Sequence, residues 1–470
     1  MNLASLVLFA TPLGLPVAPT PQGSEAAQLV LRDVTLFDVR EGTRSPGRTV
    51  VVRNGAIAAI LENGAAEPDA ESVLEGAGRL LVPGFVDTHV HLSQVLGSDA
   101  SGGPELLDDD AEEAYVETLR TSFLAHGTTT IQDMGMRETW LLQALDWSLA
   151  GAPDRPDLFV VGATFNTRHD WDRTPPPHQL QLADPDAARA KVHEYADLGI
   201  ERIKLYWKLE APELAAAVEA ARDRNVAMYA HIDNNIGSLR DTLELGVRHF
   251  EHFFTLAPGI LVMEDHWNRV GERSGIVGHG TIDEFAASMV ALLDYIDATP
   301  ELRERFDELV GDMAERKASL STTLHVLAAS AGRGRPFSSF ERFPERDAPT
   351  LPNYDDERRR ILRGAFDGVL RLVRSAHEAG VTLRIGTDCH NGGAALLSEL
   401  ELLVEAGIPL ADVLRIATWN GATALGLDDR GAVEVGRKAD LVLFDADPFE
   451  DPANLRRGLT VVKDGVVLGG

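Results

Sequence analysis

Eight strand-like segments separated by amphipathic helical stretches constrain the fold of this chain more than any other feature. The segments are GFVDTHVHL (84–92), TTTIQDMG (128–135), LFVVGATFN (158–166), ERIKLYW (201–207), VAMYAHID (226–233), RHFEHFF (248–254), ASLSTTLHV (318–326) and TLRIGTDCH (382–390). Strands that alternate with helices form parallel sheets. Eight such units over roughly 300 residues predict an α/β fold with a (β/α)8 TIM barrel. A doubly wound open sheet is the alternative, but no Gly-rich phosphate fingerprint follows the first strand.

The two ends of the chain have a different pattern, in which short strands are bounded by Gly, Asn and Pro. Such segments occupy residues 29–83 and return as ADLVLFDADP (439–448) and LTVVKDGVVLGG (459–470). We therefore expect residues 28–83 and 429–470 to form one small β-sandwich domain. The predicted barrel, residues 84–428, is then an insertion between its two parts.

Three connections between the predicted strands are long, at 93–127, 255–317 and 327–381. Loops that follow barrel strands form the rim of the active site, so we expect these connections to cap a pocket and to set specificity. Each contains helix-like stretches, such as residues 280–296.

The charge balance excludes some partners. A formal net charge of −29 argues against nucleic acid and anionic membrane surfaces, because both require basic patches. The apolar stretch LASLVLFATPLGLPVA (3–18) predicts a weak export signal, so residues 1–27 are expected to be a signal peptide or a disordered N-terminus. It is too short and proline-broken for a membrane span. Periplasmic or extracellular export is the prediction, and a cytoplasmic location is the alternative.

Polar residues gather at the C-terminal ends of the predicted strands, which is where barrel active sites lie. His89 and His91 share one face of the first strand, because side chains two residues apart point the same way. The other strand ends carry Lys204 (fourth), His231 (fifth), His252 (sixth), His325 (seventh) and Asp388 (eighth). Packing does not explain polar groups at the same end of six strands. The pattern therefore predicts a metal site.

Strand parity directs Lys204 and Tyr206 into the barrel. An ammonium group beside divalent ions would be repelled and has no lone pair to offer. Lys204 is then an ion-pair partner, a nucleophilic amine of lowered pKa, or a carbamate formed with carbon dioxide that can bridge two metals. The residues alone leave these three roles open.

Several motifs together resemble the amidohydrolase superfamily. They are PGFVDTHVH, IKLY, YAHI, FEH and GTDCH, followed by ATWNGATALGL (417–427) and GRKADLVLFD (436–445). The chain is similar to the binuclear branch related to imidazolonepropionase-like hydrolases and prolidase-type dipeptidases. The resemblance implies that His89, His91 and Asp388 hold one ion and that His231 and His252 hold the other. It also implies that Lys204, as a carbamate, bridges both ions together with a hydroxide. Zinc is the default ion, with manganese, iron or cobalt as alternatives.

The function that follows is hydrolysis of an amide-type C–N bond in a small molecule, by attack of the metal-bridging hydroxide. The candidate substrates are a dipeptide, an N-acyl amino acid or a cyclic amide. Asp388 is the expected general base and then general acid. A lactonase or phosphotriesterase, a mononuclear deaminase and a non-catalytic scaffold are the alternatives, and homo-oligomerisation is left open.

Other polar residues receive weaker predictions. Tyr206 is placed to donate a hydrogen bond to substrate, with barrel packing as the alternative. For His325 and His390, substrate contact and packing are equally expected. His249 should face away from the site, and Arg384 should point into the lower barrel. His178 is expected to be structural or exposed.

Overall fold

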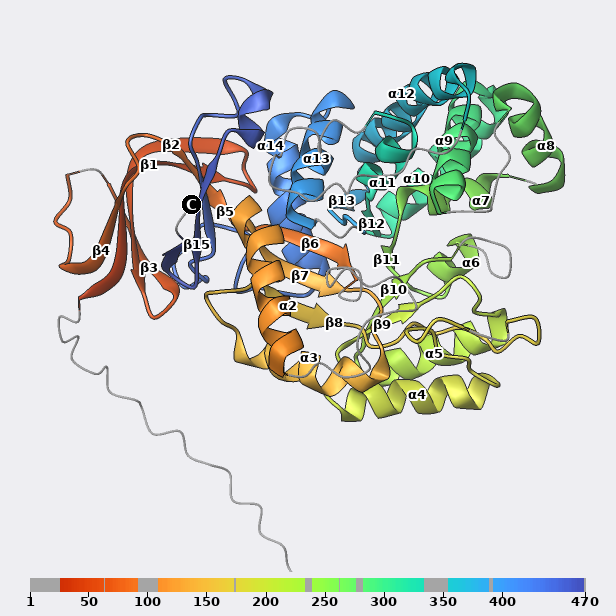
Figure 1. Ribbon diagram of the computed structural model, residues 1–470, viewed down its shortest axis with the longest axis horizontal. Coiled ribbons are helices and arrows are strands. Elements are labelled where there is room, and N and C mark those ends of the chain that lie inside the picture. The colour runs from red at the N-terminus through yellow and green to blue at the C-terminus, as the bar shows by residue number, and fades with distance from the viewer. Residues whose placement is uncertain are drawn as a thin grey trace, which may run out of the picture.

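The computed structural model describes residues 26–62, 64–91, 109–172, 175–232, 239–261, 263–275, 282–333, 354–388 and 392–468. Strands from both chain ends lie together on one side of the molecule, and the parallel strands and their helices form the rest (Figure 1). The predicted export signal and His390 lie outside the described residues, so both predictions stay untested.

The two chain ends contribute to one eight-stranded sheet. Its strands are β1 (Ala27–Asp38), β2 (Thr43–Arg53), β3 (Ala56–Glu62), β4 (Ala70–Glu75), β5 (Leu80–Pro83), β14 (Leu441–Phe444), β15 (Leu459–Lys463) and β16 (Val466–Leu468). The order is β16-β15-β14-β5-β1-β2-β3, and β4 pairs with β1. The N-terminal and C-terminal parts meet where β5 pairs antiparallel with β14, with Val82 opposite Val442. The strands form a single hydrogen-bonded sheet, and its division into a two-layer sandwich stays a prediction.

Two tight hairpins set the register at the edges of this sheet. Asn54 and Gly55 connect β2 to β3 with φ angles of 50° and 73°, and Asp464 and Gly465 connect β15 to β16 with φ angles of 50° and 76°. Two-residue hairpin turns with positive φ at both positions favour Asn-Gly and Asp-Gly, because their twist matches that of the strands. The local sequence therefore dictates both turns.

Each of the eight predicted segments in the middle of the chain contains a strand, although the strands are shorter than expected. They are β6 (Phe85–Val90), β7 (Thr128–Asp133), β8 (Asp157–Val160), β9 (Arg202–Leu205), β10 (Ala227–Ala230), β11 (His249–Phe250), β12 (Ser319–Ser321) and β13 (Thr382–Arg384). Neighbouring strands pair in parallel, in a three-stranded sheet β6-β7-β8 and a five-stranded sheet β13-β12-β11-β10-β9.

Backbone hydrogen bonds cross both seams between these two sheets. At one seam Thr88 N donates to Ile385 O at 2.9 Å. At the other, Phe165 N donates to Lys204 O at 2.9 Å and Tyr206 N donates to Phe165 O at 3.0 Å. The strands thus follow one another around in sequence order, whereas a single closed barrel sheet stays a prediction.

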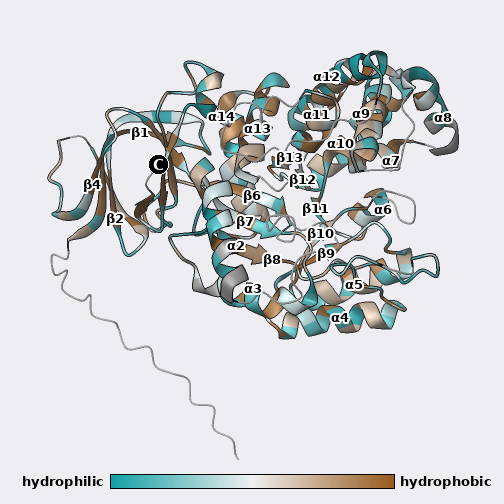
Figure 2. Cartoon of the chain, in the orientation of Figure 1, coloured by the Kyte–Doolittle hydropathy of each residue, from teal (hydrophilic) through white to brown (hydrophobic). Residues whose placement is uncertain are grey.

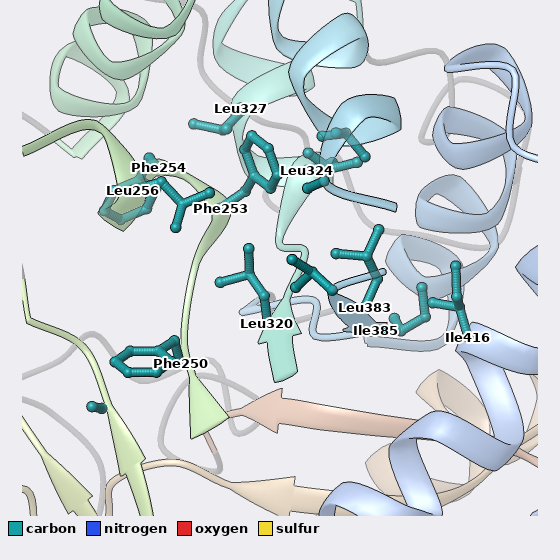
Figure 3. Close-up of a cluster of buried hydrophobic side chains, with 14 of the residues drawn as sticks. Phe250, Phe253, Phe254, Leu256, Leu320, Leu324, Leu327, Leu383, Ile385 and Ile416 are labelled. Carbon is teal, nitrogen blue, oxygen red and sulfur yellow. The ribbon is translucent and has the colours of Figure 1, made fainter. Parts of the chain in front are cut away.

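The strand register separates an apolar face from a polar one. Phe250, Leu320 and Leu383 are in register on β11, β12 and β13, and they pack with the side chains of helix α11 (Leu324–Ser330) (Figure 3). On the opposite face the register aligns Lys204, Tyr229, His249 and Ser319. Successive residues of a strand point to opposite faces, so this alternation buries aliphatic groups against helices and collects polar groups inside.

Helices cover the strands and fill the long connections. Their bounds are α2 (Asp109–Ser122), α3 (Glu138–Ala150), α4 (Pro185–Asp197), α5 (Ala211–Asp223), α6 (Leu239–Glu244), α7 (Leu256–Ile260), α8 (Met263–Ser274), α9 (Ile282–Ala298), α10 (Pro300–Glu315), α11, α12 (Asp356–Glu378), α13 (Gly392–Glu405), α14 (Leu410–Arg415) and α15 (Gly421–Ala424). Short turns are η1 (Leu124–His126), η2 (Phe253–Thr255), the π-helical η4 (Ile416–Asn420) and η5 (Pro452–Arg456).

Helix α12 shows why these segments become surface helices. Asp355 caps its first turn by accepting a hydrogen bond from Arg358 N at 2.9 Å. Leu362, Phe366 and Val373 are buried at helical spacing. The helix accordingly carries both hydrophilic and hydrophobic residues around its circumference (Figure 2). Among the described residues, no helix is long and apolar enough to cross a membrane.

The parallel strands and the end sheet are joined through a buried group of charges around Asp157, the first residue of β8. Lys463 of β15 is fully buried, and its Nζ lies 3.1 Å from Asp157 Oδ1. Arg430 Nη1 and Lys438 Nζ lie 2.6 Å and 2.5 Å from Asp157 Oδ2. These cations hold the pKa of the Asp157 carboxyl below its usual range, although burial acts in the opposite direction.

We expect Asp157→Asn to destabilise the protein by about 3–5 kcal/mol, because it leaves buried cations without their shared anion. The measurement is the Tm and the denaturant midpoint of the whole chain. Asp197→Asn is the control, since that carboxylate is 71% exposed in its pair with Arg224 and should contribute at most about 1 kcal/mol. Equal shifts for the two variants would show that the buried charges do not join the two parts.

Candidate metal centre

Three predicted ligands converge just beyond the ends of the first and eighth parallel strands. His91 Nε2 lies 3.4 Å from Asp388 Oδ1, and His89 Nε2 lies 3.7 Å from the same oxygen. One donor atom from each of the three residues falls within 4.8 Å of the others. Two imidazoles and a carboxylate at this separation can hold a divalent ion.

The other two predicted histidines continue this group without a break. The His252 ring centroid lies 4.5 Å from that of His89 and 4.5 Å from that of His231. His252 Nδ1 lies 3.9 Å from Asp388 Oδ2. The structure therefore brings His89, His91, His231, His252 and Asp388 into one cluster.

Burial favours the neutral form of all four imidazoles. Burial, followed by repulsion from neighbouring positive groups, lowers the pKa of His231 to about 3 and holds the pKa values of His89 and His252 well below normal. Burial lowers the pKa of His91 as well, although nearby carboxylates oppose it. A metal ligand must offer a lone pair, so neutral imidazoles are the required form.

Lys204 lies inside this cluster and is 1% exposed. Its Nζ and both ring nitrogens of His231 have no hydrogen-bond partner among the described residues. Burial lowers the pKa of the Lys204 amine to about 8, and the charges of Glu251 and Asp388 oppose that shift. Buried polar atoms without partners are costly, and this donor set fits bound cations.

The backbone adopts a left-handed conformation at three neighbouring strand ends. The φ angles are 64° at His252, 42° at Thr323 and 49° at Asp388. Such conformations are uncommon for residues other than glycine, and each costs on the order of 1–3 kcal/mol. The strain aims these side chains along directions that regular strands do not provide.

Glu251, which the strand-end pattern did not single out, lies directly beneath the cluster. His89 Nδ1 donates a hydrogen bond to Glu251 Oε2 at 2.6 Å, and Glu251 Oε1 forms an ion pair with Arg384. Glu251 and Arg384 are both fully buried. Burial raises the pKa of Glu251, but Arg384 and Lys204 outweigh it and hold the carboxyl ionised. A carboxylate behind a ligating histidine fixes its tautomer and its orientation.

Arg384 points into the interior as predicted, and the structure supplies its partners. Besides Glu251 it donates to Phe250 O at 3.1 Å, to Ser319 Oγ at 3.1 Å and to Thr88 Oγ1. The only sequence signal for Glu251 was a charged residue within an otherwise largely apolar and aromatic segment, HFEHFF.

Two predictions were wrong, one on where a strand ends and one on strand parity. The seventh strand does not end in His325, because β12 stops at Ser321 and the left-handed Thr323 starts helix α11. His325 is buried there, with Nδ1 2.9 Å from Ser398 Oγ. His249 does not face away from the interior, since its ring stacks on Tyr229 with centroids 5.0 Å apart.

Two further residues border the cluster. Tyr206 lies beside His231, with ring centroids 5.0 Å apart, so its predicted position is consistent with the structure. His178, which was expected to be structural or exposed, lies 6.1 Å from the His91 ring in the connection between β8 and α4. Burial and the charge of His91 lower the pKa of His178 to about 4.

The two sides of the cluster differ in polarity and exposure. Phe254 stacks on His252 with ring centroids 4.9 Å apart, and Phe285 of α9 packs edge-on against Phe254 at 5.5 Å. The side chain of Asp388 is 26% exposed, whereas that of His252 is 6% exposed. The aromatic rings cover the His252 side, so solvent reaches the cluster on the Asp388 side.

Parallel strands with an enclosed histidine–carboxylate cluster at their C-terminal ends are typical of metal-dependent α/β proteins. The family model described as the Amidohydrolase family matches residues 80–469. This match covers most of the chain, and the chain belongs to that family.

The relatives of this chain carry several functions. Imidazolonepropionase from Alteromonas mediterranea is 28% identical over 245 residues, which cover 43% of this chain and 58% of that protein. N-acetylglucosamine-6-phosphate deacetylase from Bacillus subtilis is 23% identical over 438 residues, covering 90% of this chain and 94% of that protein. A solved prolidase in complex with N-methylphosphonate-L-proline has a TM-score of 0.64 at 19% identity and covers 94% of this chain and 99% of its own. The fold is thus that of the amidohydrolases, and the names of these relatives indicate different substrates.

We expect Glu251→Gln to weaken divalent-ion binding by about 10–100-fold, because it removes the anion that orients His89 and leaves Arg384 without its charged partner. Competition with a chromophoric chelator measures the affinity. Glu219→Gln is the control, since that side chain is 67% exposed in its pair with Arg189. Unchanged affinity in Glu251→Gln would mean that the carboxylate serves only to pair with Arg384.

Proposed function

We propose that this protein is a binuclear metal-dependent hydrolase of amide-type C–N bonds. His89, His91 and Asp388 hold one divalent ion, and His231 and His252 hold the other. Lys204, as a carbamate, would supply anionic oxygen ligands to both. The observation that supports this proposal most directly is the buried Lys204 amine, which has no hydrogen-bond partner among the described residues and lies amid neutral imidazoles.

A carbamate accounts for the position of Lys204 better than the other two roles. As an ammonium it would repel any cation held by the surrounding histidines, and it has no hydrogen-bonded anion among the described residues. The lowered pKa, about 8, leaves a fraction of the amine unprotonated near neutral pH, and this is the form that reacts with carbon dioxide. The product is an anion with two oxygen atoms, which suits two neighbouring cations.

The proposed ions supply Lewis acidity and lower the pKa of bound water towards ~7. Zinc is the expected ion, and manganese, iron and cobalt also suit a set of nitrogen and oxygen ligands. The charges of the protein's own groups favour cation binding, because Glu251 and Arg384 neutralise one another and Asp388 adds a negative charge.

Asp388 is the group that moves protons. Its carboxylate lies within 4 Å of nitrogen atoms of His89, His91 and His252, and it is the most exposed of these side chains. It can therefore contact the ions and an entering substrate at once. It takes a proton from the attacking water and delivers it to the leaving amine, which departs poorly without that proton.

The substrate class follows from chemistry and from similarity together. The imidazolonepropionase, the deacetylase and the prolidase support a small substrate with a C–N bond to a carbonyl carbon, such as a dipeptide, an N-acyl amino acid or a cyclic amide. Tyr206, beside His231, is placed to donate a hydrogen bond to a substrate oxygen.

Reconstitution of the metal-free protein tests the proposed centre. In bicarbonate buffer the wild-type chain should take up two zinc ions, whereas Lys204→Met, which keeps the length and removes the amine, should bind fewer and more weakly. The metal content after gel filtration and the chelator-competition affinity are the measurements. Lys191→Met, on the surface of α4, is the control. Two tightly bound ions in Lys204→Met would exclude the bridging role.

We expect Asp388→Asn to lower kcat/KM by about 10²–10⁴-fold, because the amide cannot exchange the proton that the leaving amine requires. The assay is hydrolysis of a panel of dipeptides, N-acyl amino acids and cyclic amides, with lactones and aryl esters beside them. Asp367→Asn, half exposed on α12, should retain full activity. Preferential turnover of the esters by the wild-type protein would favour the lactonase alternative.

A further inference from the structure

Glu399 is a fully buried carboxylate for which the proposed reaction has no use. It lies on α13, and its hydrogen bonds all reach the turn between β12 and α11. Thr322 Oγ1 donates to Glu399 Oε2 at 2.6 Å, and His325 N donates to Oε1 at 2.5 Å. The backbone N–H of Leu324 also donates to this carboxylate. One side chain therefore accepts hydrogen bonds from three residues of a single turn, on both sides of Thr323.

The residue enclosed by these anchors is Thr323, which has a left-handed backbone. Its φ and ψ angles are 42° and 39°, an unfavourable conformation for a β-branched residue. Thr322 and Leu324, on either side of it, are both bound by Glu399. Thr323 N donates to Gly386 O at 3.2 Å, which ties the same turn to the segment that carries Asp388. Strained conformations of this kind persist when surrounding contacts hold them in place.

The strained turn places a hydroxyl group behind a predicted metal ligand. Thr323 Oγ1 lies 3.2 Å from His252 Nδ1. His252 also has a positive φ, of 64°, so its ring direction is not set by a regular strand. When a hydroxyl accepts the Nδ1 proton of an imidazole, the Nε2 lone pair is left to bind a cation.

We propose that Thr323 and Glu399 are positioning residues for the ion held by His231 and His252. Glu399 holds the turn, and Thr323 Oγ1 accepts the Nδ1 proton of His252, so that Nε2 faces the ion. This inference rests on the proposed function, because it assumes that His252 is a ligand. Thr323 orients His252 through its hydroxyl group, whereas Glu251 orients His89, a proposed ligand of the other ion, through a carboxylate.

Two substitutions at Thr323 separate the hydroxyl from the shape of the side chain. Thr323→Val keeps the β-branched shape and removes the hydroxyl, whereas Thr323→Ser keeps the hydroxyl. Zinc affinity is measured on the metal-free full chain in bicarbonate buffer by chelator competition. We expect one of the two ions to bind about 10–100-fold more weakly in Thr323→Val, and both to bind normally in Thr323→Ser. Circular dichroism and the Tm of the metal-free variants verify folding.

A double-mutant cycle tests whether Glu399 acts through Thr323. Glu399→Gln keeps the size of the side chain but replaces one of its two acceptor oxygens with an NH2 group, which cannot accept the hydrogen bond made there, so we expect it to weaken the same ion several-fold. In the Thr323→Val background it should have little further effect. The effects of two substitutions are not additive when one residue acts through the other. Ser398→Ala, the neighbouring substitution on α13, should leave both ions unchanged.

The outcomes distinguish this inference from the proposed function. A wild-type chain that takes up two ions, with Thr323→Val binding both equally well, would overturn the role of Thr323. Additive effects in the double variant would overturn the connection to Glu399. A wild-type chain that takes up no divalent ion would instead contradict the proposed function, whatever the variants do.

Discussion

The buried ion pair between Glu251 and Arg384 is the contact on which the rest of this structure depends. Arg384 ends β13, and it reaches Ser319 of β12, the backbone of β11 and Thr88 of β6. Glu251 in turn accepts from His89. Because β6 and β13 belong to different sheets, these contacts bridge the seam between the three-stranded and five-stranded sheets. A buried charge without its partner is strongly destabilising, so the pair links the fold and the cluster above it.

The interior and the exterior of the parallel strands serve different purposes. The outer face is aliphatic and aromatic, and it buries Phe250, Leu320 and Leu383 under helices (Figure 3). The inner face carries polar groups that would be unfavourable in an apolar core unless each had a partner. Below the histidine–carboxylate cluster, hydrogen bonds to other protein groups supply these partners. Within the cluster, Lys204 Nζ and the ring nitrogens of His231 have no partner among the described residues, and these unpartnered polar atoms are the physical argument for bound cations.

Three residues with a left-handed backbone lie where the proposed chemistry takes place. His252, Thr323 and Asp388 follow three successive strands and all have positive φ. Each is held by contacts from another element, such as Thr323 by Glu399 and Asp388 by a hydrogen bond from its N–H to His89 O at 2.8 Å. These contacts hold the strained conformations, which direct side chains that regular strands would aim elsewhere.

The sequence by itself determined the parts of this protein that depend on local pattern. The eight strands, the two hairpin turns and the gathering of His89, His91, His231, His252 and Asp388 follow from periodicity, turn residues and strand order. Only the tertiary structure decided the positions of Glu251, His249 and His325. Strand β11 ends at Phe250 and His252 has a positive φ, so alternation counted back from His252 misplaces His249 and Glu251. Strand β12 ends before His325, which follows a left-handed turn. The contacts of His178 and Glu399 likewise join segments far apart in the sequence, and no local pattern encodes which loops meet.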